Sequence, residues 1–292
     1  MPKYICFDIG GTDVKYSLAD QDGNLLAPNV FSSENGSGKA ILDGIERIVK
    51  KEKRIKGVAI SAPGFVNPET GFLENGGAIP EFHRIPLKDI LEEKLNLRVS
   101  VENDVNCVAL GEKWKGNAKK DRDFMCMTIG TGVGGAIFID NRLYRGHSFK
   151  AGEFGYMITH GVQDSAPNDS ILSHIASVLS LRKHYAAMKE LPLGEVTGLD
   201  VFNAYDDREE IAVGLVRQFY LTTAISIFNL SYIINPRKIL IGGAISSRPS
   251  LISELKEQLV YLGLNPLDPV IDLCLLKNHA GMTGALYHHL YS

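Results

Sequence analysis

The sequence predicts an α/β protein of two domains, each built on a mixed sheet. Strand-like and helical stretches alternate along most of the 292 residues. One pattern, a strand, a glycine-rich turn, a strand and a polar turn, occurs near residue 3 and again near residue 124. This weak internal repeat predicts two similar domains. We expect a smaller domain at 1–117 and a larger one at 118–279, with the helix at 280–292 packing back on the first.

The first domain opens with alternating apolar residues that predict strands at 3–9 and 13–19. A third strand around 24–31 would complete a meander, and a helix is expected near 38–50. The remaining expected elements are a strand at 55–61, a helix near 87–95, a strand at 97–104 and a helix at 104–115.

The second domain repeats the opening, with strands on both sides of the glycine-rich turn at 130–132. Helices are expected around 168–189 and 200–234. The rest should be a strand at 237–243, a helix near 249–262, a strand at 270–276 and a helix from about 280. No apolar run is expected to reach membrane-spanning length.

Composition limits the class of protein. The chain is 45% hydrophobic and 22% charged, which is typical of a soluble globular protein. The net charge of −3 gives no electrostatic argument for nucleic acid or an anionic membrane. Four scattered cysteines without a CxxC pattern argue against a disulfide frame, and no signal peptide is apparent. We therefore expect a cytoplasmic protein.

The first glycine-rich turn has two interpretations. Gly10-Gly11 suits a tight hairpin, because both central positions can need a positive φ. Consecutive glycines also let backbone N–H groups converge on a phosphate. A Walker loop would lead into a helix, whereas this turn leads into a strand. Asp8, just before the turn, is suited to face a metal ion that accompanies phosphates.

Two further glycine sites strengthen the phosphate interpretation. The stretch Gly130–Gly135 matches GxGxxG, but it opens a strand, whereas a dinucleotide-binding motif opens a helix. We interpret it as a second phosphate hairpin. Gly242-Gly243 follows an apolar strand and precedes a helix, where glycine lets a flat ligand or phosphate approach the backbone.

Two carboxylate motifs suggest chemistry on a hydroxyl compound. Glu102, Asn103 and Asp104 end an apolar strand, where Asn103 or Asp104 would cap the next helix. The functional alternative makes Asp104 a general base. Glu153, among glycines, is either a solvated loop carboxylate or a group that holds two hydroxyls of a polyol.

These motifs together carry a family resemblance over essentially the whole chain. The stretches DIGGTDVK, SAPGFVNPETG, VENDVN, TIGTGVGGAIF, AGEFGYM and ILIGGAIS resemble the ROK sugar kinases in order and spacing. Within that family, GGAI at 76–79 and AGEFGYM are most similar to the β-glucoside kinases. The resemblance implies an actin-like, hexokinase-type (ribonuclease H-like) fold of two domains, with ATP and sugar in the cleft between them.

The resemblance also implies roles for individual residues. Asp104 would be the catalytic base, and ATP and Mg²⁺ the cofactors, with Asp8 near Mg²⁺. The implied nucleotide-binding residues are Asp8, Gly10, Gly11, Thr12, Lys15, Gly130, Thr131, Gly132, Gly242 and Gly243. The implied sugar-binding residues are Gly64, Asn75, Gly76, Asn103, Asp104, Glu153 and Tyr156. A homodimer is implied as well.

One departure from the family pattern bears on the substrate. ROK kinases commonly have a His three residues after the sugar-binding Glu, followed by a cysteine-rich zinc cluster. Here that position is Tyr156, and residues 157–176 contain no cysteine. His160 and His174 are isolated, so we expect no structural zinc.

The expected reaction is ATP-dependent phosphorylation of the C6 hydroxyl of a glucosyl unit, preferentially in β-glucosides such as cellobiose. One alternative is a glucokinase that acts on free glucose. Another is a sugar-binding ROK regulator without kinase activity, or a sugar-binding module that has lost catalysis. The family's repressors carry a DNA-binding helix-turn-helix before the first strand, whereas this chain begins its first strand at about residue 3.

Overall fold

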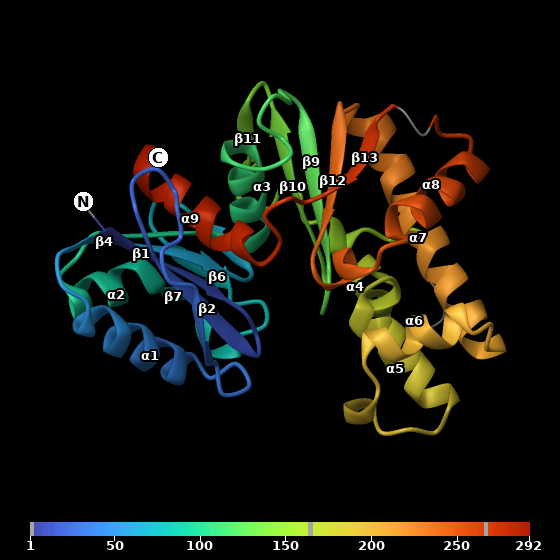
Figure 1. Ribbon diagram of the computed structural model, residues 1–292, viewed down its shortest axis with the longest axis horizontal. Coiled ribbons are helices and arrows are strands. Elements are labelled where there is room, and N and C mark those ends of the chain that lie inside the picture. Colours follow the sequence, from blue (N-terminus) through green and yellow to red (C-terminus); the bar gives the residue numbers. More distant parts are fainter. Residues whose placement is uncertain (1–2, 163–165, 266–267) are drawn as a thin grey trace. The chain divides into compact units, whose positions relative to one another are not determined.

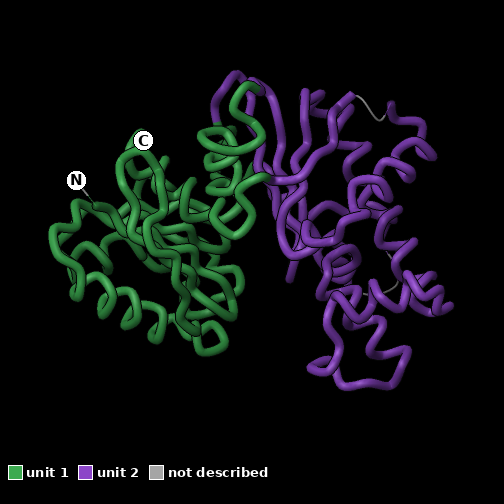
Figure 2. Tube along the Cα trace, viewed as in Figure 1, with its two compact units in different colours: residues 1–120, 143–151, 275–292 green, residues 121–142, 152–274 purple. Residues whose placement is uncertain are grey.

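The computed structural model describes residues 3–162, 166–265 and 268–292, which form two compact units (Figure 1). Unit 1 comprises residues 1–120, 143–151 and 275–292, and unit 2 comprises residues 121–142 and 152–274 (Figure 2). The segment 143–151 therefore groups with unit 1, although it lies inside the range 118–279 that we expected to form the second domain. Residues 275–279 also group with unit 1.

Unit 1 is built on a five-stranded mixed sheet in the order β3-β2-β1-β4-β8. These strands are β1 (Lys3–Ile9), β2 (Asp13–Ala19), β3 (Asn29–Ser32), β4 (Ile55–Ala62) and β8 (Val99–Asn103). Strands β1 to β3 are antiparallel neighbours, whereas β4 and β8 run parallel to β1. In the register, Asp8 pairs with Ser61, and Ser61 with Glu102, so three polar residues share the carboxyl edge.

Helices cover both faces of this sheet. The alternation of β1 sends Ile5, Phe7 and Ile9 into a core with α1 (Gly38–Lys51) and α2 (Leu87–Leu95). Cys6 faces the opposite side, where a smaller core includes residues of α3 (Asp104–Trp114) and α9 (Ala280–Tyr291). A small sheet of β5 (Phe65–Asn67), β6 (Phe72–Asn75) and β7 (Ile85–Pro86) adjoins this frame. The third strand begins five residues later than expected, because Pro28 offers no N–H to a ladder.

Helices α3 and α9 meet backbone to backbone. A Cβ on Gly284 would overlap the carbonyl oxygen of Cys107, and one on Gly111 would lie 2.7 Å from the carbonyl oxygen of Ala280. Glycine is therefore required where the two helices pack together. This contact fixes the first turn of α3, which carries Asp104, against the helix that begins near Asp8.

Unit 2 repeats the sheet order of unit 1 as β11-β10-β9-β12-β13. Its strands are β9 (Phe124–Ile129), β10 (Val133–Ile139), β11 (Arg142–Tyr144), β12 (Lys238–Gly242) and β13 (Val270–Leu273). Its helices are α4 (Leu172–Ile175), α5 (Val178–Met188), α6 (Gly198–Asp206), α7 (Glu210–Ile234) and α8 (Leu251–Tyr261). The identical order is consistent with the internal repeat read from the sequence.

Two predicted helices of unit 2 are interrupted. The stretch 168–189 is divided into a 3₁₀ turn, α4 and α5, because the Ser177 side chain accepts from the Ser180 N–H and starts a new helix. The stretch 200–234 is divided into α6 and α7. A capping box of Thr197 and Asp200 starts α6, and the chain turns at Asp207.

Helix α7 corrects our expectation about long apolar runs. Its 25 residues are long and apolar enough to cross a membrane by length and composition alone. Half of its most apolar window is buried, and Val216, Phe219 and Ile227 belong to the main core of unit 2. A helix that is apolar on most faces is expected where it forms the interior of a large domain. We therefore describe α7 as a core helix.

Candidate active site

Asp8 lies at the carboxyl edge of the unit 1 sheet with polar neighbours on both sides. The Ser61 hydroxyl donates to its Oδ1 at 2.6 Å, and the Lys15 ammonium lies 4.0 Å from its Oδ2. A Cβ on Gly281 would be only 2.5 Å from Oδ1, so α9 begins against this carboxylate. Burial raises the pKa of Asp8, while the Ser61 hydrogen bond and the Lys15 charge oppose the increase. The side chain keeps 21% of its surface exposed.

Asn103 is the residue that caps α3. Its Oδ1 accepts from the N–H groups of Val105 and Asn106, each at 3.0 Å. Its amide nitrogen donates to the Gly64 carbonyl at 2.9 Å and to Asp104 Oδ1 at 3.0 Å. Of the two cap candidates in the sequence, Asn103 takes the position. Asp104 is left as the first helical residue.

Asp104 has the electrostatics of a general base. Its Oδ1 accepts from the Val105 N–H at 2.9 Å as well as from Asn103. Burial, and secondarily the negative charge of Asp8, raise the pKa of Asp104 to about 7 despite these hydrogen bonds. A carboxylate that titrates near neutral pH can take a proton from a hydroxyl and release it again. Such perturbed groups concentrate at active sites.

The expected sugar-side residues of unit 1 lie in one place. Gly64 has a φ of +88°, and a Cβ there would overlap the Asn75 carbonyl oxygen and lie 2.7 Å from the Gly77 nitrogen. A Cβ on Gly76 would overlap the Ile79 carbonyl oxygen. Because Asn103 also donates to the Gly64 carbonyl, the structure brings Gly64, Asn75, Gly76 and Asn103 together.

The first glycine hairpin borders the same loop. A Cβ on Gly11 would lie 3.2 Å from Ala78 Cβ, directly after the 75–77 stretch. The Ser33 hydroxyl donates to the Gly11 carbonyl at 2.8 Å, and the Ser33 N–H donates to the Thr12 carbonyl at 2.9 Å. These contacts hold the turn from its carbonyl side.

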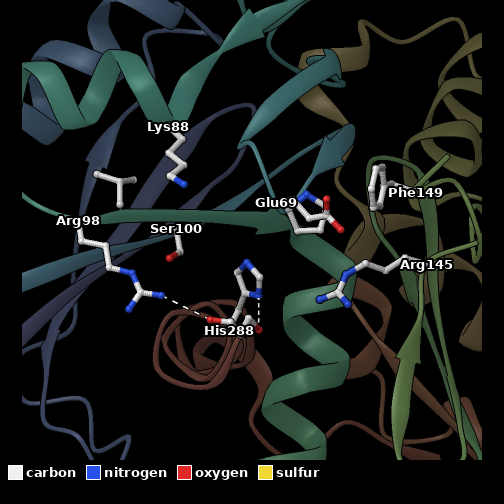
Figure 3. A pocket seen from close by; sticks show the side chains of 10 residues that line it. Glu69, Lys88, Arg98, Ser100, Arg145, Phe149 and His288 are labelled. Carbon is white, nitrogen blue, oxygen red and sulfur yellow. Dashed lines mark hydrogen bonds between the residues drawn. The ribbon is translucent and has the colours of Figure 1, made fainter. Parts of the chain in front are cut away.

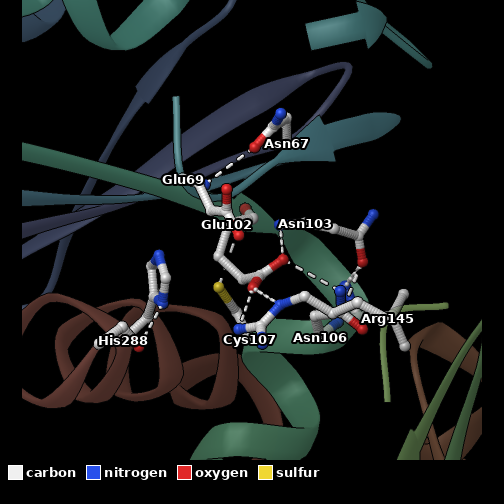
Figure 4. A network of polar contacts seen from close by, with 10 residues as sticks. Asn67, Glu69, Glu102, Asn103, Asn106, Cys107, Arg145 and His288 are labelled. Atoms are coloured by element: carbon white, nitrogen blue, oxygen red, sulfur yellow. Dashed lines mark hydrogen bonds and ion pairs between the residues drawn. The ribbon is translucent and has the colours of Figure 1, made fainter. Parts of the chain in front are cut away.

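An ion pair between buried Glu102 and Arg145 lies beside Asn103, and the sequence analysis missed it (Figure 4). Glu102 is fully buried, and its Oε2 accepts from Arg145 Nε at 2.8 Å. Its Oε1 accepts from the Asn103 N–H at 2.8 Å and from the Asn106 side-chain amide at 3.0 Å. The sequence signal was a carboxylate in an apolar strand, but its partner lies 43 residues away on the segment 143–151.

The second glycine hairpin belongs to unit 2. The Gly130 N–H donates to the Gly132 carbonyl at 2.9 Å, and Thr131 is exposed at the tip. Gly243 has a φ of +83°, and a Cβ there would lie 2.6 Å from the Ile129 carbonyl oxygen. Gly242 pairs with Thr128 at the end of β9. The structure thus places the 242–243 turn beside the 130–132 hairpin.

Glu153 and Tyr156 also belong to unit 2. Gly152 has a φ of +87°, and a Cβ there would lie 2.9 Å from the Gly135 carbonyl oxygen, so the segment packs on β10. Glu153 immediately precedes a 3₁₀ turn, Phe154–Tyr156. The Tyr156 side chain is 53% exposed. Asn103 and Asp104 lie in unit 1, so the expected sugar-binding residues are divided between the units.

Zinc-bearing relatives carry zinc ligands in the segment after Glu153. In this protein, the His160 side chain in that segment contacts other side chains. The His160 ring contacts the Thr159 hydroxyl at 3.0 Å and the Gln218 amide at 3.3 Å. Within residues 3–162, 166–265 and 268–292, no group of three or more His, Cys, Asp or Glu is placed to hold a metal ion. Residues 163–165 of the expected cysteine-free segment lie outside the described residues. The absence of zinc stays a prediction.

The repeated sheet order, the glycine hairpin in each unit and a carboxylate base at a helix start define an actin-like, hexokinase-type sugar kinase. The chain belongs to the ROK family, whose model matches residues 4–290. It is 40% identical to the β-glucoside kinase of Listeria monocytogenes, over 99% of this chain and 97% of the relative. The β-glucoside kinase of Klebsiella pneumoniae is 37% identical, over 98% and 95%.

Solved structures show the same fold. A Listeria monocytogenes protein that is called an N-acetylmannosamine kinase has a TM-score of 0.94, 40% identity and coverage of 99% and 98%. A ROK family protein from Streptococcus pneumoniae in complex with sucrose has a TM-score of 0.85 and 28% identity, covering 99% and 98%. The expected family and fold class are confirmed, and the protein is an ATP-dependent carbohydrate kinase.

Proposed function

We propose that this kinase phosphorylates the C6 hydroxyl of a glucosyl unit and prefers β-glucosides such as cellobiose, giving the 6-phospho-β-glucoside and ADP. The observation that carries the proposal is Asp104, a base with a pKa of about 7 beside the polar loop of Gly64 and Asn75. The β-glucoside kinases at 37–40% identity support this substrate over free glucose, since a similar glucokinase, from Halalkalibacterium halodurans, is 29% identical.

The chemistry follows from these groups. Asp104 accepts the proton of the C6 hydroxyl as its oxygen bonds to the γ-phosphorus, and the bond to the β–γ bridging oxygen breaks to release ADP. Asn103 and Glu153 hold sugar hydroxyls, with Gly64, Asn75 and Gly76 lining the sugar on the unit 1 side. Backbone N–H groups of the hairpins at 10–12 and 130–132 hold the phosphates. Lys15 adds a positive charge next to Asp8.

The residues present fit Mg²⁺. Asp8 offers a partly exposed carboxylate, the oxygen ligand that Mg²⁺ prefers. Burial, and secondarily the negative charge of Asp8, raise the pKa of Asp104, so a cation held by Asp8 would reduce the repulsion between the two carboxylates. Asp8 would hold the ion through the ATP phosphates or through water, and the bound ion would neutralise phosphate charge.

The preference for β-glucosides rests on Tyr156. A site that hydrogen-bonds a free hydroxyl discriminates strongly, because its buried polar groups lose a partner when that hydroxyl is absent. In zinc-bearing relatives the His at this position helps to form the wall near C1 and C2 of the sugar. Tyr156 replaces it with an aromatic side chain that is 53% exposed, suited to pack on a second sugar ring. The demand for a free anomeric hydroxyl is thereby relaxed.

Competition kinetics test the substrate. Equal concentrations of glucose, cellobiose and N-acetylmannosamine compete for limiting ATP, and the phosphorylated products are separated and quantified. We expect 6-phosphocellobiose to predominate. Tyr156→Ala should lower that share, whereas the charge-neutral surface change Tyr261→Ala in unit 2 should not. Predominant glucose 6-phosphate would leave an ordinary glucokinase, and a predominant N-acetylmannosamine product would reassign the acceptor.

We also propose that the kinase is a cytoplasmic homodimer. Support for a reducing compartment comes from the four buried cysteines, none of which forms a disulfide: Cys6, Cys107, Cys126 and Cys274. Light scattering on the purified protein would measure the dimer mass.

The regulator alternative predicts DNA binding, which a gel-shift experiment with random-sequence duplexes tests directly.

A further inference from the structure

Unit 1 contains a cavity of about 360 Å³, and none of the described residues that line it is an expected nucleotide- or sugar-binding residue (Figure 3). It is framed by the β5–β6 turn at Pro68 and Glu69, the first turn of α2 at Lys88, and the start of β8. The segment 145–149 and the end of α9 complete its wall. Its volume lies at the small end of the range for ligand pockets, so its occupant would be a small molecule.

The lining of this cavity is cationic. Figure 3 shows Lys88, Arg98 and Arg145 extending toward it from different sides. Of the described side chains that line it, that of Glu69 is the one carboxylate. No ion pair between side chains of the described residues includes Lys88 or Arg98, and Arg98 donates to a main-chain oxygen of Ser292 at 3.5 Å. Charge-assisted bonds from two such cations suit a phosphate.

Neutral polar groups beside these cations could form hydrogen bonds with the parts of a ligand other than its phosphate. The Ser100 hydroxyl and the His288 ring line the same cavity. His288 is buried, and its Nδ1 lies 2.8 Å from the Ser292 hydroxyl. Hydroxyl and imidazole groups next to two cations match a compound that carries both a phosphate and hydroxyls, and also inorganic phosphate alone.

Arg145 connects the cavity to the residues next to Asp104. Its guanidinium lines the cavity and also forms the buried ion pair with Glu102. Glu102 in turn accepts from the Asn103 N–H, and Asn103 contacts Asp104. An anion that draws Arg145 toward the cavity would weaken its hold on Glu102 and so alter the position of the residues next to the base.

We propose that this cavity is a second, noncatalytic site for a small phosphate-bearing anion, and that its occupancy modulates the kinase through Arg145. None of the described residues that line the cavity belongs to the hairpins at 10–12 and 130–132, and the site does not depend on which sugar the enzyme accepts. Inorganic phosphate and a hexose phosphate share the required chemistry, and the experiment separates them.

Isothermal titration calorimetry tests the site directly. Inorganic phosphate or glucose 6-phosphate is titrated into protein saturated with a non-hydrolysable ATP analogue, Mg²⁺ and the accepted sugar, so that the catalytic site is filled. We expect one site per chain, with the tighter ligand identifying the natural source. The double variant Lys88→Gln/Arg98→Gln should bind at least about tenfold more weakly. The double variant Arg47→Gln/Lys51→Gln, which removes the same charge from α1, should bind as wild type does.

Initial rates of ADP release, measured with and without the anion, test whether occupancy of the cavity changes kinase activity. The anion should change kcat/KM for the sugar in wild type and in the α1 control, and should have no effect in the cavity variant. No binding to the saturated wild type, or equal binding by the cavity variant, would overturn the site. Binding with unchanged rates in all three proteins would overturn the role of Arg145.

Discussion

Asp104 combines two properties that a structural carboxylate rarely has together. It is held by Asn103 and the Val105 N–H, which favour the ionised form, yet burial and Asp8 raise its pKa to about 7. The folded protein therefore carries an ionised Asp104 above pH 7 only at a cost in stability. A position kept at such a cost is one where chemistry is expected.

Replacing Asp104 with Asn should separate catalysis from folding. We expect kcat to fall by about 10²–10⁴-fold, because the amide cannot accept the proton. Since the folded-state pKa lies above the unfolded value of 3.8, ionisation destabilises the fold as pH rises toward 8. The variant should therefore have a thermal midpoint at pH 8 equal to or above that of wild type. Asp89→Asn, on the exposed side of α2, is the control for a surface charge. More than about a tenth of wild-type kcat would reduce Asp104 to a structural role.

The pH profile should report the same group. Because the base must be ionised, kcat/KM for the sugar should rise with pH and level off above a midpoint near 7. Well below that midpoint, the rate should fall about tenfold per pH unit. Steady-state kinetics at saturating Mg²⁺–ATP from pH 5.5 to 8.5 measure this. A flat profile would show that another step, or another group, limits the reaction.

The residues that could be predicted from the sequence are those whose position follows from the pattern of their immediate neighbours. Asp8, Asn103 and Asp104 interrupt or end apolar strands, so their position at a sheet edge could be predicted from alternation. The sequence could not decide between Asn103 and Asp104 as the helix cap, which depends on the backbone conformation at the strand end. It assigned nothing to Arg145, because that side chain matters only through a tertiary contact with Glu102.

At the scale of elements, the contact between α3 and α9 positions the carboxyl edge of the unit 1 sheet, where Asp8 and Asp104 lie. Both helices reach that edge with their N-terminal residues, Asp104 on α3 and Gly281 beside Asp8 on α9. Their close approach depends on glycines at the crossing. A change of spacing there would move both carboxylates relative to each other.

Gly284→Ala should test this packing. The new methyl group would overlap the Cys107 carbonyl, so α3 and α9 must separate, at a cost of about 1–3 kcal/mol in the free energy of unfolding. We also expect kcat to fall, because α3 carries Asp104. Gly214→Ala on α7 is the matched control: a Cβ there has open space, and helix propensity should stabilise it by up to about 1 kcal/mol. Urea unfolding gives both values. Equal midpoints for the two variants would contradict the required close contact.

Element boundaries were predictable where one periodicity persists. The helices α1, α2 and α3, and the hairpin strands β1, β2, β9 and β10, follow the expected ranges closely. The long ranges 168–189 and 200–234 were wrong as single helices, because Ser177 caps a new helix inside the first range and the chain turns at Asp207 inside the second. Capping depends on side-chain orientation, which the apolar pattern does not contain.

At the scale of the whole molecule, the two units share one sheet order, yet their boundaries do not follow the sequence pattern. The composition change at 118–123 does mark the end of the long first stretch of unit 1. The return of residues 143–151 to unit 1 has no composition signal. Within unit 1 this segment pairs through Arg145 with Glu102, and through Lys150 with Glu74 at 3.0 Å.

Stoichiometric zinc should be absent from the purified protein. A structural site needs four Cys or His ligands, and His160 already contacts Gln218. Mass spectrometry of metals, on protein prepared without chelators, should find well under one zinc per chain. A zinc-bearing ROK kinase purified in parallel is the positive control. A full equivalent of zinc that survives dialysis would contradict the prediction.

The divided unit 1 also sets an order of events on the ribosome. The chain passes between the units after residues 120, 142, 151 and 274, so the unit that begins the chain is completed only by residues 275–292. Unit 2 has all of its residues at 274 and can fold first, while α3 still lacks the helix that covers it. Asp104 acquires its buried environment, which raises its pKa, only after α9 has been synthesised. Chains released after residue 279, which lack α9, should therefore contain all of unit 2 and have no kinase activity.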